Sequence, residues 1–206
     1  MGVRLKSQIK KWIISSMKNK TILFDTFNTL PIDKNILNVF MILIGSLSIG
    51  LLAQASIPIP FSPVPITGQT IGVVLVGSLL GSKKGALCIL LYLMEGGLGL
   101  PVFANMSAGA HVLIGPTGGY LWGFIIGAMI MGYSKEKNLI PSFLNCFLAC
   151  LVSTTTIILI GTFYLSFFVG DINKALGLGL YPFLFGDVVK SFTCAVIIQG
   201  SRRVFS

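Results

Sequence analysis

Long runs of apolar residues dominate this 206-residue chain and are separated by short polar segments. An α-helix that crosses the hydrocarbon core of a bilayer needs about 20 predominantly apolar residues. On that basis the pattern predicts six membrane helices, at about residues 36–55, 66–81, 86–100, 117–133, 142–169 and 181–200. The third runs into EGGLGLP (95–101), which is typical of a helix that ends or unwinds inside the protein.

The basic residues test this count independently, because cytoplasmic loops collect Lys and Arg. With the N-terminus inside, the cytoplasmic segments hold thirteen of the fifteen basic residues: Arg4, Lys6, Lys10, Lys11, Lys18, Lys20, Lys34, Lys83, Lys84, Lys135, Lys137, Arg202 and Arg203. The opposite loops hold only Lys174, and Lys190 lies inside the last span. The predicted fold class is therefore an all-α integral membrane protein with six transmembrane helices and both termini cytoplasmic.

The composition agrees, since 54% hydrophobic and 10% charged residues do not suit a soluble surface. The net charge of +9 is explained by topology rather than by a nucleic-acid partner, because the basic residues lie between apolar segments. The four cysteines lie in apolar runs and indicate neither a metal site nor a disulfide framework. The chain has no G-x-x-x-x-G-K-[ST] phosphate loop, and one histidine without a paired nucleophile argues against a membrane hydrolase. We expect no enzyme activity.

Two charged residues stand inside the last apolar span, in the sequence FLFGDVVKSF (183–192). Each charge costs about 2.5 to 3.5 kcal/mol at the bilayer centre on insertion scales, so ionisable residues there usually serve a function. Asp187 and Lys190 are three residues apart and share one helix face, where they can pair. They offer either an ion pair that holds the helix or a hydrogen-bond acceptor and donor for a ligand near the outer side.

Other polar residues near the outer ends of the spans are candidates for the same ligand: Gln69, Thr70, Tyr92, Asn105 and Tyr120. Their alternative role is to satisfy polar groups at helix ends. Glu95 fits either the cavity or, preferably, a structural role at the broken end of the third helix. His111 is expected to be an ordinary loop residue. The small residues of the first span, including Ser46 and Gly50, permit close helix packing either inside the fold or against another membrane protein.

Four motifs then carry a resemblance: PFSPVPITGQT (60–70), LYLMEGGLGLPVFA (91–104), GPTGGYLWGF (115–124) and GDVVK (186–190). In this order and spacing they resemble the BioY family, the biotin-specific substrate-binding (S) subunits of energy-coupling factor (ECF) transporters. The match covers residues 36 to 200. The chain departs from the family pattern at Phe185, at Gly68 and in the less glycine-rich loop NMSAGAHVLI (105–114).

The resemblance implies a six-helix subunit of the bacterial cell membrane that captures biotin from outside. It implies a transmembrane coupling (T) subunit and ABC-type ATPases as partners, membrane lipid as the surroundings, and no cofactor other than biotin as transported substrate. By this resemblance, Asp187 binds the N–H groups and Lys190 the carbonyl oxygen of the ureido ring of biotin. The alternative that Lys190 binds the valerate carboxylate stays open. The apolar body of the ligand suits Phe103, Tyr92 and Trp122, with Gln69, Asn105 and Tyr120 completing the site.

Two alternatives remain at this point. One keeps the fold and changes the ligand to thiamine, riboflavin or another vitamin; the other is a structural membrane protein whose charged pair only fixes helix packing. We divide the chain into a basic segment (1–35) that forms either an amphipathic helix on the membrane surface or a disordered leader, the membrane domain (36–200) and a cytoplasmic tail (201–206).

Overall fold

A computed structural model describes residues 33–204, and the prediction for the basic N-terminal segment lies outside that range except at its end. The elements of the described chain are α3 (Lys34–Gln54), β1 (Ser56–Ile57), β2 (Ile66–Thr67), α4 (Gln69–Gly97), η1 (Ala104–Met106), α5 (Ala110–Ile114), α6 (Gly118–Glu136), α7 (Phe143–Val169), α8 (Ile172–Gly179) and α9 (Tyr181–Val204). The two short strands pair antiparallel, with Ser56 opposite Thr67.

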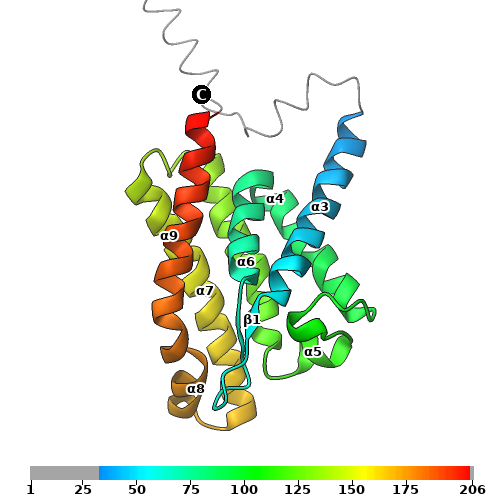
Figure 1. The fold of residues 1–206 in the computed structure, drawn as a ribbon, viewed down its shortest axis with the longest axis vertical. Helices are drawn as coiled ribbons and strands as arrows, with labels where there is room; N and C mark the ends of the chain where they lie inside the picture. Colours follow the sequence, from blue (N-terminus) through cyan, green and yellow to red (C-terminus); the bar gives the residue numbers. More distant parts are fainter. Residues whose placement is uncertain (1–32, 205–206) are drawn as a thin grey trace, which may run out of the picture.

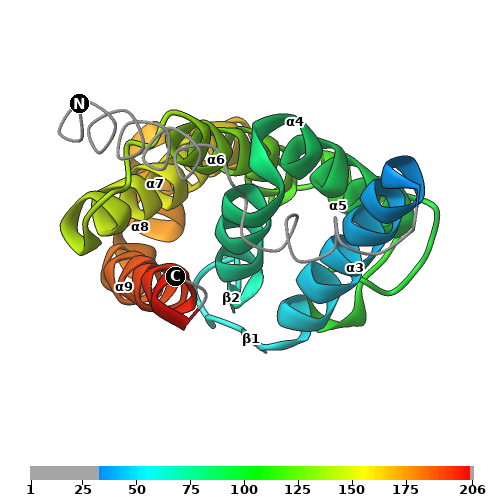
Figure 2. The ribbon, with the colours of Figure 1, turned by 90° about the horizontal axis from the view of Figure 1, so that it is seen from above.

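The long helices form a bundle in which α3 and α9 lie on opposite sides of α4 (Figure 2). The start of α3 and the end of α9 lie at the same end of the bundle, while β1 and α8 lie toward the other end (Figure 1). In the described chain, α3, α4, α7 and the Tyr181–Ser201 part of α9 are long and apolar enough to cross a membrane. The protein is therefore an all-helical, multi-pass membrane protein, as the hydropathy pattern predicts.

Four of the predicted spans match single helices. The bounds of α3, α6, α7 and α9 lie within four residues of those predicted. Polar caps fix several of these ends: Asp33 accepts a hydrogen bond from the Asn35 amide at 2.9 Å, and the Ser142 hydroxyl accepts one from the Asn145 amide at 3.3 Å. The left-handed Gly170, with φ of 73°, ends α7.

The second and third predicted spans are different, because they form the single element α4. The prediction of a loop between them is wrong: only Gly81 leaves the helical conformation, with φ of 83° and ψ of 177°. Only glycine adopts such a backbone readily, so one residue turns the chain. The Gln69 side chain donates to the Tyr92 hydroxyl at 2.5 Å, although 23 residues of straight helix would separate them by about 34 Å. The two arms of α4 therefore fold back on each other as a hairpin.

Helix α6 packs closely against this hairpin. A Cβ on Gly77 would lie 2.5 Å from the Ala128 carbonyl oxygen, so α4 and α6 approach at backbone distance. At the turn, Glu136 accepts hydrogen bonds from the Ser82 amide (2.7 Å) and from the Ser82 hydroxyl (2.9 Å). The acid thus caps the start of the second arm, where a helix favours negative charge.

The interior is divided into three apolar clusters. One joins α3, α4 and α6 around Ile49, Tyr92 and Phe124. A second joins α4, α7 and α9 and contains the buried thiols of Cys146, Cys150 and Cys194. A third, toward the end of the bundle that carries β1 and α8, contains Val64, Tyr120, Leu165 and Phe183. Between the clusters at this end the packing leaves a cavity.

The small residues of α3 pack inside the fold, which decides between the two roles left open for them. Gly45 and Gly50 are buried, and a Cβ on Gly45 would lie 2.6 Å from the Cys88 sulfur of α4. Ser46 donates a short hydrogen bond to Glu95. Glu95 thus links α3 to α4 and does not line the cavity, which confirms the structural role preferred from the sequence. Its partner is a side chain of α3.

Candidate functional site

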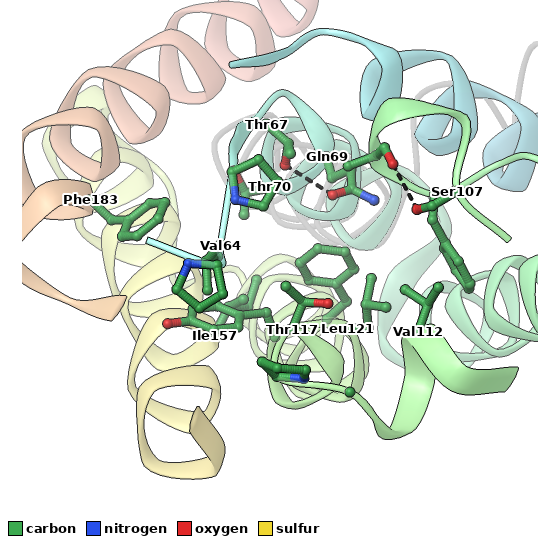
Figure 3. A pocket seen from close by; sticks show the side chains of 18 of the residues that line it. Val64, Thr67, Gln69, Thr70, Ser107, Val112, Thr117, Leu121, Ile157 and Phe183 are labelled. Carbon is green, nitrogen blue, oxygen red and sulfur yellow. Dashed lines mark hydrogen bonds between the residues drawn. The ribbon is translucent and has the colours of Figure 1, made fainter. Parts of the chain in front are cut away.

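One cavity of about 400 Å³ opens among the β1–β2 loop, the start of α4, the segment 103–117, α6, α7 and α9. Most of its wall is apolar, from residues such as Val64, Leu121 and Phe124. Figure 3 shows Gln69, Thr70, Thr117 and Phe183 around this space. The polar side chains on its wall are Thr67, Gln69, Thr70, Asn105, Ser107, His111, Thr117, Tyr120, Asp187 and Lys190. An apolar pocket with a few convergent polar groups is the usual form of a small-molecule site.

Asp187 and Lys190 both line this cavity from α9. Asp187 is 3% exposed, and its Oδ2 accepts a hydrogen bond from the Thr155 hydroxyl of α7 at 2.7 Å. Lys190 is partly buried and forms no ion pair with Asp187 within residues 33–204. The ion pair, one of the two roles that the sequence leaves open for these residues, is therefore absent from the described chain. In an ion pair that served only packing, the two charged groups would contact each other, whereas here both residues line the cavity.

Gln69 and Tyr92 form a relay rather than two separate contacts. The Thr67 hydroxyl donates to Gln69 Oε1 at 2.9 Å, Gln69 Nε2 donates to the Tyr92 hydroxyl at 2.5 Å, and Tyr92 donates to the Val102 carbonyl at 3.0 Å. Gln69 lines the cavity, but Tyr92 is fully buried behind it and is absent from the wall. Tyr92 thus fixes Gln69 and the segment at Val102.

Phe103 and Asn105 lie on the segment that follows α4. Phe103 is 1% exposed and meets the Tyr92 ring edge to face, with centroids 5.5 Å apart. Its ring lies over Gly96, where a Cβ would come within 2.2 Å of it. Asn105 has a left-handed backbone (φ 55°), and its Oδ1 accepts a hydrogen bond from the Ser56 hydroxyl at 2.5 Å. Both residues line the cavity.

Tyr120 contributes its ring, since its hydroxyl is already occupied. The hydroxyl donates to the Gly179 carbonyl of α8 at 2.9 Å and lies 3.2 Å from the Thr162 hydroxyl. The ring packs beside Phe183, with centroids 6.3 Å apart. Tyr120 therefore ties α8 to α6 and α7 while it forms part of the apolar wall.

Six of the seven predicted site residues thus line one cavity. Trp122, expected against the apolar body of the ligand, is 45% exposed, is absent from the wall and donates to the Leu113 carbonyl at 3.1 Å. Phe185, one of the departures from the family pattern, is 82% exposed on α9 and is also absent from the wall. Gly68 is required locally, since a Cβ there would lie 2.8 Å from the Leu52 carbonyl oxygen.

Three functional candidates were missed or undervalued from the sequence. Thr155 contacts Asp187, and the signal for it was the polar run Thr154–Thr156 inside an apolar span. Thr70 is among the polar candidates of the sequence but has no place in the biotin site that the resemblance implies; its Oγ1 is the one buried side-chain polar atom without a hydrogen-bond partner in the described chain. His111, expected to be an ordinary loop residue, lies on α5 and lines the cavity.

Comparison with known proteins gives a consistent result. The family model described as the BioY family matches residues 20–206. The biotin transporter BioY of Thermotoga maritima is 42% identical over 150 residues, covering 73% of this chain and 88% of the relative. Biotin transporter BioY2 of Lactococcus lactis is 34% identical over 170 residues, covering 81% and 90%. Among solved structures, the S-component for biotin from an ECF-type ABC transporter superposes with a TM-score of 0.75 at 27% identity, covering 84% of this chain and 95% of that one.

Proposed function

The chain belongs to the BioY family, and we propose that it binds biotin in the cavity beside α9 and takes part in its uptake. One observation carries the proposal: Asp187 and Lys190 face the same cavity without pairing with each other. The named relatives are transporters, and the family is one of transport proteins rather than enzymes.

The chemistry of biotin fits the wall of this cavity. Its ureido ring presents two N–H donors and one carbonyl acceptor, while the thioether ring and the valerate chain are apolar. Asp187 accepts from N–H groups, and Lys190 donates to a carbonyl oxygen. Because hydrogen bonds to charged groups are worth more than neutral ones, about 1.5 to 3 kcal/mol each, this pair can supply much of the discrimination. The ring of Phe103 and the apolar wall at Leu121 and Phe124 suit the rest of the ligand.

We further propose six membrane crossings, made by α3, the two arms of α4, α6, α7 and α9. The turn at Gly81 is followed by Lys83 and Lys84, and α6 ends near Lys135 and Lys137, which favours the cytoplasm for that end of the bundle. Both termini would then be cytoplasmic, and the cavity would open to the outside. The location proposed is the bacterial cell membrane.

The energy for uptake would come from partners. The solved relative is a component of an ECF-type ABC transporter, and we propose a transmembrane coupling subunit and ABC-type ATPases for this chain as well. Biotin uptake is to be measured in a biotin-requiring cell that expresses this chain with or without such subunits. Equal uptake in both cells would refute the need for partners.

Binding of labelled biotin to the purified protein in detergent tests the ligand and the site. We expect Asp187→Ala and Lys190→Ala each to weaken binding by at least about tenfold. Lys174→Ala, which removes an exposed charge from α8, is the matched control and should bind as the parent does. Parent-like affinity in both site variants would exclude this site, and no binding by the parent would exclude biotin. Competition with thiamine and riboflavin separates the related vitamins.

A further inference from the structure

The only histidine of the chain, His111, lies on the wall of the cavity with its ring free to act. It belongs to the short helix α5 and is exposed, so it stands where the cavity meets the solvent. Within residues 33–204 its side chain forms no hydrogen bond or ion pair. A free polar ring on the wall of a largely apolar cavity is available to a ligand.

The local backbone makes room for this ring. Gly109, which has a left-handed φ of 101°, lies directly beneath it: a Cβ there would be 2.8 Å from His111 Nδ1 and 3.0 Å from Cε1. The Gly109 amide donates to the Gly96 carbonyl at 2.7 Å, which anchors the segment to the end of α4. The imidazole is thus held on a fixed segment rather than on a free loop.

The two polar regions of the cavity differ in their access to water. Asp187 is almost completely buried, whereas His111 is exposed. A carboxylate loses much hydration when it is buried, and it is repelled by a second carboxylate nearby. A ligand with an uncharged polar head and a free carboxylate therefore fits in one direction, with its head at Asp187 and its carboxylate toward the solvent and His111.

We propose that His111 receives the carboxylate of the substrate and so makes the site selective for the free acid over its uncharged derivatives. The imidazole donates an N–H to a carboxylate oxygen, whichever nitrogen carries the proton. This inference rests on the proposed function, since it assumes biotin as the ligand. It also assigns the orientation that the sequence leaves open, because Lys190 is then reserved for the ureido carbonyl.

The test compares the dissociation constants of biotin and of its primary carboxamide for the parent, His111→Ala and His111→Gln. For His111→Ala we expect binding of the acid to weaken about three- to tenfold, as for one partly exposed hydrogen bond to a charged group. Binding of the amide should stay within about twofold, which also shows that the site is folded. His111→Gln retains an N–H donor and should restore most of the preference for the acid. Lys174→Ala controls for a general change of charge.

Each other outcome overturns the proposal in a distinguishable way. Equal weakening of acid and amide in His111→Ala would mean that the ring only packs. An unchanged preference in His111→Ala that collapses in Lys190→Ala would place the carboxylate at Lys190. Failure of the parent to bind either compound would refute the proposed function itself, and this inference with it.

Discussion

The hydroxyl of Thr155 is the contact that holds Asp187, and its removal should weaken substrate binding. Thr155→Val keeps a β-branched side chain of nearly the same shape but deletes the donor that lies 2.7 Å from Asp187 Oδ2. Asp187 is 3% exposed, so water does not easily replace the lost hydrogen bond. The carboxylate is then free to turn toward Lys190 or away from the cavity.

The magnitude follows from the strength of the bond. A hydrogen bond to a charged group contributes about 1.5 to 3 kcal/mol, and each 1.4 kcal/mol is a tenfold change in affinity. The hydrogen bond between Thr155 and Asp187 exists before the ligand arrives. Its loss therefore lowers the affinity for biotin only through the poorer orientation of Asp187. We therefore expect the lower end of the range, a rise of about tenfold in the dissociation constant for biotin.

Labelled-biotin binding to purified protein measures this change, with Thr155→Ser and Thr156→Val as matched controls. Thr155→Ser keeps the hydroxyl and should bind within about threefold of the parent. Thr156 is the next residue, and its hydroxyl donates to the Val152 carbonyl of its own helix at 2.7 Å, so its loss should leave binding unchanged. A Thr155→Val protein that is folded and binds biotin like the parent would show that Asp187 needs no positioning. An equal loss of affinity in Thr156→Val would mean that a general disturbance of α7, and not the contact with Asp187, weakens binding.

Three further predictions concern other parts of the site and its scaffold. Thr70→Val should weaken biotin binding about three- to tenfold with little loss of thermal stability, because its Oγ1 has no protein partner in the described chain. A lower Tm with unchanged affinity for biotin would contradict this. Gly96→Ala should lower the free energy of unfolding by about 1 to 3 kcal/mol, seen as a lower Tm in detergent, since the new methyl overlaps the Phe103 ring. Gly177→Ala, at a helical position of α8 where no atom lies within 4 Å of the new methyl, is the control, and an equal loss of stability there would remove the packing argument. Glu136→Ala should lower the free energy of unfolding by about 0.5 to 2 kcal/mol, because the Ser82 amide loses its capping acceptor, and Glu136→Gln should be less affected. The same Tm for the parent and the alanine variant would show that the cap is dispensable.

The long helices could be predicted because a membrane helix requires a long, continuous run of apolar residues. The bounds of α7 differ from the prediction by a single residue, at its start. The one-residue turn of α4 could not be predicted, because the sequence from Gly81 to the two lysines is equally compatible with a loop. Only the φ of 83° at Gly81 shows that a single residue turns the chain. The short helices α5 and α8 are too short to give such a run and were not predicted.

The site was predictable as a set of residues but not as a set of contacts. Asp187 and Lys190 stand out because charge is rare in apolar spans, and both reach the cavity. That Tyr92 serves Gln69 and not the cavity depends on the folding back of α4, which brings together residues 23 positions apart. Thr155 could not be selected from the run of three threonines, because only the packing of α7 on α9 decides which of them meets Asp187.

The hairpin of α4 has a consequence for the depth at which the substrate is held. Its first arm, from Gln69 to Leu80, rises about 18 Å, since an α-helix advances about 1.5 Å per residue. In the topology proposed above, the turn lies at the inner interface of a hydrocarbon layer about 30 Å thick, and Gln69 would then lie about 12 Å below the outer interface. The substrate is thus held at the level of the lipid tails, so every polar edge that it brings must be met by the protein or by water that enters with it. In this topology, capture of the substrate would itself be a partial entry into the membrane.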